Sequence, residues 1–172
     1  MTTEKAPMPH INSVTVLGAG TMGAQIALHC ANAGIPALLL DLTADIAKQG
    51  LEKARKLKPD PQFTPDAYKL VTTGGFDTHL DLVGKTDWIM EAVVERLDIK
   101  QQLLAKVDER RRPGSIVSSN TSGIPIAAIG MPDVFELTID PGRRCSSTFA
   151  SSCCLMSSRS TTASMIQSVF DI

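Results

Sequence analysis

The sequence predicts an α/β protein built around a doubly wound parallel sheet. Short apolar runs alternate with helical patterns from Ile11 to about Ile129, the order expected of a parallel sheet with helices on both faces. The first of these runs ends at Leu17 and leads into a glycine-rich turn and then a helical stretch. A strand, a glycine turn and a helix in this order are typical of a phosphate-binding unit.

The turn has the spacing G-x-G-x-x-G at Gly18, Gly20 and Gly23. Gly18 permits a tight turn, Gly20 lets a pyrophosphate approach the backbone, and Gly23 lets the helix lie close to the sheet. The helix start also offers free N–H groups and a positive dipole end to phosphate. The turn therefore predicts a dinucleotide site. The intervening residues Ala19, Thr21 and Met22 are also expected to contact the cofactor.

Asp41 strengthens this prediction, because it follows Gly23 by eighteen residues and closes the next apolar run. A carboxylate there can bond the ribose 2′-hydroxyl and repel a 2′-phosphate, which favours NAD over NADP. The alternative is an ordinary strand–helix turn that uses glycine only for its backbone freedom. That alternative accounts for the glycines but not for Asp41, so we expect a Rossmann-type fold that binds NAD.

The other elements follow from apolar periodicity and from helix start and stop signals. Thr43 is expected to cap a charged helix, and Glu91 interrupts an otherwise apolar strand. In the amphipathic helix after that strand, Leu97, Leu103, Leu104 and Val107 are expected to face inward. We predict helices at 21–32, 44–58, 67–70, 95–112 and 124–129, and strands at 14–17, 37–42, 71–73, 88–93 and 115–120.

Bulk properties exclude several classes of function. The net charge of −1 over 172 residues gives no electrostatic reason to expect nucleic acid or an acidic membrane surface as a partner. No apolar run is long enough to span a bilayer, and the first ten residues resemble neither a signal nor a transit peptide, so we expect a cytoplasmic protein. Cys30 is expected in the core. Cys145, Cys153 and Cys154 lack the spacing of a zinc site, so we expect no metal.

The composition changes after Gly130. Ser, Thr or Cys occupy 14 of the 20 positions from 145 to 164, and no helical or strand period is sustained. We therefore divide the chain into a dinucleotide-binding domain at 11–130 and a tail at 131–172 that is disordered or translated out of frame. The sheet would then be incomplete at its C-terminal edge, unless 134–140 supplies an edge strand.

Three motifs together resemble the NAD-binding domain of 3-hydroxyacyl-CoA dehydrogenases: GAGTMGAQIA, DWIMEAVVERLDIKQQLL and GSIVSSNTSGIPI. The resemblance covers about 11–129 and is strongest to the large bacterial enzymes that also carry an enoyl-CoA hydratase unit. It implies that NAD oxidises the 3-hydroxyl of an acyl-CoA in fatty-acid β-oxidation. It also implies that Glu95 and Lys100 line the nicotinamide half of the cofactor, and that Asn120 and Ser122 lie beside the nicotinamide and the substrate hydroxyl.

Each of these four residues also has a purely structural interpretation. Glu95 would be an acid in the first turn of a helix, where the dipole stabilises it, and Lys100 would be a solvated surface residue. Asn120 and Ser122 would be turn and capping groups before Pro125. Their place after parallel strands favours the functional interpretation.

The family's catalytic parts are missing from the sequence. The resemblance implies a histidine base in an H-F-F-N-P segment, a glutamate that orients it, and a helical domain that completes the acyl-CoA site and forms the dimer. The only histidines here are His10, His29 and His79, and we expect none to reach the nicotinamide. We therefore expect little or no dehydrogenase activity from this chain, as for a truncated or frameshifted product.

Two alternatives stay open. One is a non-catalytic NAD-binding module that acts through a partner, which the absence of a usable histidine favours. The other is a different Rossmann oxidoreductase, such as a short 3-hydroxyacid dehydrogenase, although such an enzyme is not expected to carry VERLDIK and SSNTS together.

Overall fold

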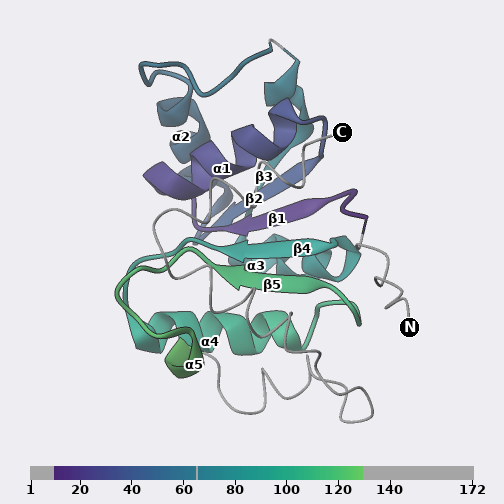
Figure 1. Ribbon diagram of the computed structural model, residues 1–172, viewed down its shortest axis with the longest axis vertical. Helices are drawn as coiled ribbons and strands as arrows, with labels where there is room; N and C mark the ends of the chain where they lie inside the picture. The colour runs from purple at the N-terminus through teal and green to yellow at the C-terminus, as the bar shows by residue number, and fades with distance from the viewer. Residues whose placement is uncertain (1–9, 65, 130–172) are drawn as a thin grey trace, which may run out of the picture.

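A computed structural model describes residues 10–64 and 66–129 (Figure 1). These residues form a five-stranded sheet in the order β3-β2-β1-β4-β5, with every neighbouring pair parallel. The predicted doubly wound sheet is therefore confirmed, and β5 is its edge within the described residues. The segment 134–140 and the rest of the predicted tail lie outside them. The strands are β1 (Val14–Leu17), β2 (Ala37–Asp41), β3 (Val71–Gly75), β4 (Trp88–Glu91) and β5 (Ile116–Ser119).

Each predicted helix forms, but the helices predicted at 44–58, 95–112 and 124–129 are shorter, spanning Ala44–Ala54, Leu97–Asp108 and Ile126–Ile129. The structure also adds two short helical elements between β3 and β4 that were not predicted. The first predicted helix is confirmed, but the second ends at Ala54, not at Lys58. Its buried stripe also ends at Ala54, and without apolar burial the next residues tighten into short i to i−3 turns. The helical elements are α1 (Thr21–Asn32), α2 (Ala44–Ala54), η1 (Ala67–Leu70), α3 (Phe76–His79), η2 (Leu80–Lys85), α4 (Leu97–Asp108) and α5 (Ile126–Ile129).

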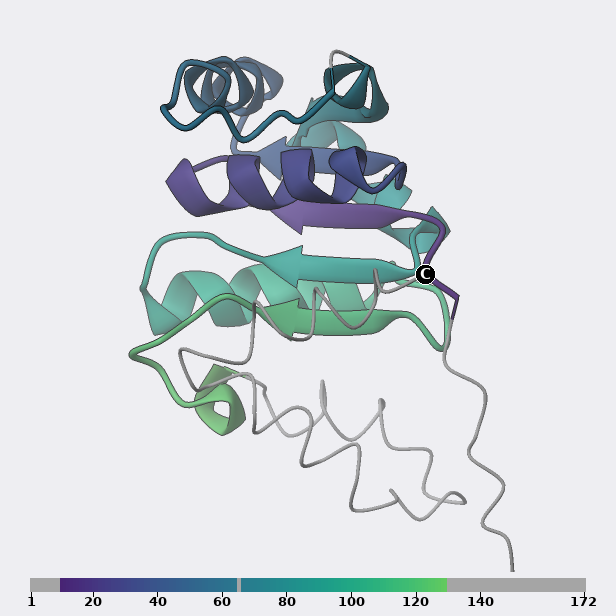
Figure 2. The same ribbon diagram turned by 45° about the horizontal axis from the view of Figure 1, so that its top comes forward.

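The helices cover both faces of the sheet. Figure 2 shows α1 in front of the sheet and α4 behind it. Alternate residues of one strand enter the two cores, because successive side chains point to opposite faces. Leu39 of β2 packs with α1 and α2, whereas Leu38 and Leu40 pack with η2 and α4. This layering confirms the α/β fold class.

Individual side chains mostly follow the predicted pattern. Leu103, Leu104 and Val107 are buried, but the prediction that Leu97 faces inward is wrong, since it is 38% exposed. Leu97 is the first residue of α4 and lies at the end of the helix, where no neighbouring element covers it. Cys30 is buried as predicted, and burial raises the pKa of its thiol to about 11.

Thr43 caps α2 as predicted, since its hydroxyl accepts a hydrogen bond from the N–H of Ile46 at 3.3 Å. Across the described residues, no helix combines the length and the apolar character that crossing a bilayer requires.

Candidate functional site

The candidate site lies at the carboxyl edge of the sheet. The arrowheads of β1 and β4 point to this edge in Figure 2. β1 and β4 are neighbours at the centre of the sheet, and their last residues, Leu17 and Glu91, are paired in register. After β1 the chain turns toward β2, and after β4 it turns toward β5, so the order of the strands reverses here. Ligands of such sheets bind at this switch point.

The turn after β1 requires glycine at two positions. Gly18 has a φ of 103°, and a Cβ on it would lie 2.6 Å from the carbonyl oxygen of Ala92. A Cβ on Gly23 would lie only 1.8 Å from the carbonyl oxygen of Gly18. The structure thus agrees with the tight turn and the close helix packing predicted for these glycines.

The start of α1 is open to an anion. A Cβ built on Gly20 meets no atom within 4 Å, so there is free space in front of the turn. No side chain caps α1, its first turn contains no acid, and the side chains of Thr21 and Met22 are exposed. The first N–H groups and the positive dipole end therefore face this space, which fits a pyrophosphate.

Asp41, the last residue of β2, joins this turn. Its Oδ2 accepts a hydrogen bond from the N–H of Ala19 at 2.6 Å, and its Oδ1 accepts one from the N–H of Leu42 at 2.7 Å. Each carboxylate oxygen keeps a further lone pair for a hydroxyl donor. Asp41 is half-buried, so a ribose can reach it beside the pyrophosphate position.

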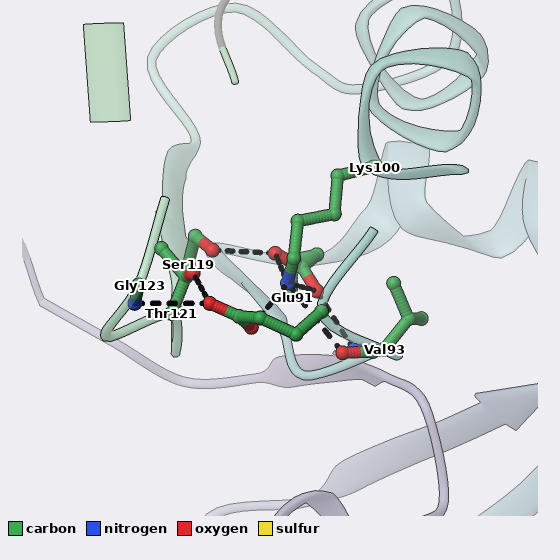
Figure 3. A network of polar contacts seen from close by, with 7 residues as sticks. Glu91, Val93, Lys100, Ser119, Thr121 and Gly123 are labelled. Carbon is green, nitrogen blue, oxygen red and sulfur yellow. Dashed lines mark hydrogen bonds and ion pairs between the residues drawn. The ribbon is translucent and has the colours of Figure 1, made fainter. Parts of the chain in front are cut away.

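On the other side of the switch point, a polar network joins the ends of β4 and β5 (Figure 3). At its centre, the Nζ atom of Lys100 lies 2.7 Å from Oε1 and 2.9 Å from Oε2 of Glu91. Both side chains are fully buried. We call the whole set the Glu91 network; its members are Glu91, Val93, Glu95, Lys100, Ser119, Thr121 and Gly123.

Further hydrogen bonds satisfy both charges of the buried pair. Oε1 of Glu91 accepts from the N–H of Val93 at 2.7 Å, and Oε2 accepts from the hydroxyl of Ser119. The ammonium of Lys100 also donates to the carbonyl of Val93 at 3.4 Å. Buried ions persist only with such partners, so this pair fixes how the segment after β4 leaves the sheet.

Glu95 connects that segment to the loop after β5. Its Oε1 accepts hydrogen bonds from the hydroxyl of Thr121 and, at 3.1 Å, from the N–H of Gly123, while its Oε2 lies 3.6 Å from Nζ of Lys100. The hydrogen bond from Thr121, more than the other contacts, lowers the pKa of Glu95, so the carboxylate stays charged. Its side chain is 45% exposed at the sheet edge.

Glu95, Lys100, Asn120 and Ser122 all lie at this edge of the sheet, but they differ in exposure to solvent. The side chains of Asn120 and Ser122 are exposed on the loop after β5, and the N–H of Asn120 donates to the carbonyl of Glu91 at 2.7 Å. The alternative that Lys100 is a solvated surface residue is wrong, because its side chain is fully buried. The predicted contacts of all four residues with the cofactor stay predictions.

Glu91, Ser119 and Thr121 belong to the network but were not among the predicted site residues. The sequence did contain a signal for Glu91, since an acid inside a buried strand almost always has a partner. Ser119 and Thr121 gave none, because their partners are 28 and 26 residues away.

The three histidines all lie away from this network. His10 precedes β1 at the opposite edge of the sheet, and the ring of His29 on α1 packs edge-on against Phe63 with centroids 6.4 Å apart. His79 ends α3 after the edge strand β3, where its Nδ1 contacts the hydroxyl of Thr78 at 2.6 Å. Among the described residues, no group of three acidic, histidine or cysteine side chains is placed to hold a metal ion.

Comparisons with known proteins agree with this geometry. Residues 13–132 match the family model described as "3-hydroxyacyl-CoA dehydrogenase, NAD binding domain". A probable 3-hydroxyacyl-CoA dehydrogenase from Bacillus subtilis is 40% identical over 74% of this chain, and a putative fatty acid oxidation complex trifunctional enzyme from Rickettsia felis is 35% identical over 72%. The chain spans 19% and 18% of the lengths of these two relatives.

Solved structures show the same likeness. The crystal structure of 3-hydroxybutyryl-CoA dehydrogenase from Escherichia coli has 30% sequence identity and a TM-score of 0.58. The match covers 70% of this chain and 27% of that one.

Proposed function

Because this chain belongs to the family of 3-hydroxyacyl-CoA dehydrogenase NAD-binding domains, we propose that it forms the cofactor half of an enzyme that oxidises 3-hydroxyacyl-CoA to 3-ketoacyl-CoA. The observation that carries the proposal is that two parts of a cofactor site lie at the same edge of the sheet. The open glycine turn with Asp41 lies on one side, and the Glu91 network with its SSNTS loop lies on the other.

Each part has a distinct role in this proposal. The turn from Gly18 to Gly23 and the start of α1 bind the pyrophosphate, and Asp41 holds the adenosine ribose and disfavours a 2′-phosphate. NAD, when bound, supplies the hydride acceptor. Glu95 and Lys100 shape the nicotinamide side, and Asn120 and Ser122 face the substrate hydroxyl from the loop after β5.

We further propose that this chain alone has little or no dehydrogenase activity. Oxidation of an alcohol needs a base for the hydroxyl proton, and a positioned base contributes about 10²–10⁴-fold to the rate. His10 and His29 lie away from the ends of β4 and β5, and so does His79. This placement favours the second candidate for the chain by itself, an NAD-binding module that acts through a partner.

The test is to measure NADH binding and turnover on the same pure protein. We expect NADH fluorescence to report saturable binding, while the oxidation of NADH with acetoacetyl-CoA stays at background. Binding without turnover supports the proposal. Absence of binding would refute the cofactor role, and measurable turnover would refute the claim that the base is missing.

A further inference from the structure

The Glu91 network carries an unbalanced charge. Two carboxylates, Glu91 and Glu95, share one ammonium, that of Lys100, which leaves a net charge of −1. Lys100 contacts Glu91 at 2.7 Å but Glu95 only at 3.6 Å, so the buried pair is neutral and the surplus charge is on Glu95. The neighbouring Arg96 does not cancel this charge, because it pairs with Asp98.

The surplus charge is held in place at the sheet edge. The hydroxyl of Thr121 and the N–H of Gly123 both donate to Oε1 of Glu95. Two segments that leave different strands thus fix one carboxylate, while its side chain keeps 45% of its surface in contact with solvent. A fixed, partly exposed charge can act on a ligand without moving.

The direction of the cofactor places its redox-active ring on this side. The proposed pyrophosphate position is at the start of α1, and Asp41 lies beyond it on β2. If the adenosine half extends toward β2, the nicotinamide half extends across the switch point toward β4 and β5. Glu95 is then the charged residue that faces the half of the cofactor whose charge changes.

We propose that Glu95 discriminates between the oxidation states of the bound cofactor and favours NAD⁺ over NADH. The nicotinamide ring carries one positive charge when oxidised and none when reduced by a hydride at C4, and the rest of the molecule is the same in both forms. A fixed negative charge beside the ring therefore stabilises the oxidised form selectively. Glu95 acts here as a specificity-determining residue, and this role rests on the proposed function.

The expected size of the effect follows from Coulomb's law. A unit charge pair separated by several ångströms near a protein surface corresponds to about a three- to tenfold change in an equilibrium constant, after allowance for solvent. Replacing Glu95 by Gln keeps an acceptor for Thr121 but removes the charge. Glu95→Gln is therefore expected to weaken NAD⁺ binding by about three- to tenfold more than NADH binding.

The experiment measures dissociation constants of NAD⁺ by calorimetry and of NADH by fluorescence, for the wild-type chain and three variants. Glu95→Gln should shift the ratio of the two constants toward NADH, whereas Glu95→Asp, which keeps the charge, should restore most of the wild-type ratio. Asp41→Asn is the matched control, since it removes a carboxylate from the adenosine side and should weaken both forms by the same factor.

The outcomes distinguish a failure of the proposed cofactor binding from a failure of the discrimination by Glu95. A wild-type chain that binds neither form refutes the proposed function itself. If the wild type binds both and Glu95→Gln leaves the ratio unchanged, the cofactor role stands and the discrimination by Glu95 is wrong. If Glu95→Gln does not fold, the wild-type ratio is measured at rising salt. Screening should then reduce the preference for NAD⁺, and a ratio independent of salt refutes the proposal.

Discussion

The glycine turn after β1 and the Glu91 network after β4 lie at the same edge of the sheet but depend on opposite kinds of residue. The turn depends on the absence of side chains, because a Cβ at Gly18 or Gly23 would overlap backbone atoms. The network depends on the presence of charged side chains that are buried and mutually satisfied. The turn is thus intolerant of a methyl group at Gly18 or Gly23. The network is intolerant of any change in charge balance.

The two regions also differ in whether their residues serve ligand binding or folding. At the turn, the open space before Gly20 is available to a ligand and makes no contact within the protein. In the network, the bonds of Glu91 and Lys100 are all internal, so their first contribution is to stability. Variants on the two sides should therefore fail in different ways.

The largest effect is expected from breaking the buried pair. Lys100→Met leaves Glu91 buried without its cation and should lower the free energy of unfolding by about 3–5 kcal/mol, measured by urea denaturation. The double variant Glu91→Gln, Lys100→Met should recover much of that loss, because neither charge remains buried. Lys106→Met, on the exposed surface of the same helix, is the control and should change stability by about 0.5 kcal/mol or less. An equal loss in both single variants would contradict the role of the pair.

The next effect distinguishes the packed side of the glycine turn, at Gly23, from its open side, at Gly20. Gly23→Ala forces a methyl group into the carbonyl of Gly18, and we expect a loss of about 1–3 kcal/mol in unfolding free energy together with weaker NAD binding. Gly20→Ala meets no protein atom, so it should fold like the wild type and still bind NAD more weakly. Thermal unfolding and NADH fluorescence on both variants check this. A Gly20→Ala chain with unchanged affinity would show that the pyrophosphate does not approach there.

A smaller effect is expected at Asp41. Asp41→Ala removes the acceptor proposed for the ribose hydroxyl, and the loss of such a charged hydrogen bond corresponds to about a tenfold weaker affinity for NAD. It should also relax the discrimination against NADP, because the repulsion of a 2′-phosphate disappears. Competition of NADPH with NADH measures both changes. Unchanged selectivity would remove Asp41 from its proposed role.

The smallest effect concerns pH. Contacts in the fold lower the pKa of Glu95, chiefly the hydroxyl of Thr121, so its contribution to stability is present above the pKa of an unfolded glutamate. That contribution is lost as the pH falls through the lower, folded pKa. The free energies of unfolding of the wild type and Glu95→Gln should therefore converge at pH values below the folded pKa of Glu95 and separate at higher pH. Curves that stay parallel throughout would mean that the Thr121 contact does not bias the ionisation of Glu95.

Local signals made the fold and half of the site predictable. The residues from Val14 to Asp41 form a contiguous unit whose turn, helix and acid are all readable in order, and the structure has α1 at its predicted bounds. Where the prediction depended on burial it was less accurate. α2 ends at Ala54 because its apolar stripe ends there, and Leu97 is exposed because it is the first residue of α4, at the very end of the helix.

The Glu91 network shows the limit of sequence reasoning most clearly. Lys100 is open to two interpretations, a cofactor contact or a solvated surface residue. The structure excludes the solvated one, because Lys100 is in a buried ion pair, and the cofactor contact stays a prediction. That environment depends on the backbone of Val93, two residues after Glu91, and on Ser119, which approaches Glu91 only when β4 and β5 pair. No spacing along the chain encodes that pairing directly.

The sequence by itself determined the α/β class, the glycine turn and the acid that follows it. Each of these depends on local backbone conformation or on a period repeated along the chain. Only the tertiary structure decided which charges are buried and which remain at the edge. A charge is neutralised by neighbours in space, and the turn from β4 into α4 brought Glu91, Lys100 and Glu95 together while leaving the surplus on Glu95.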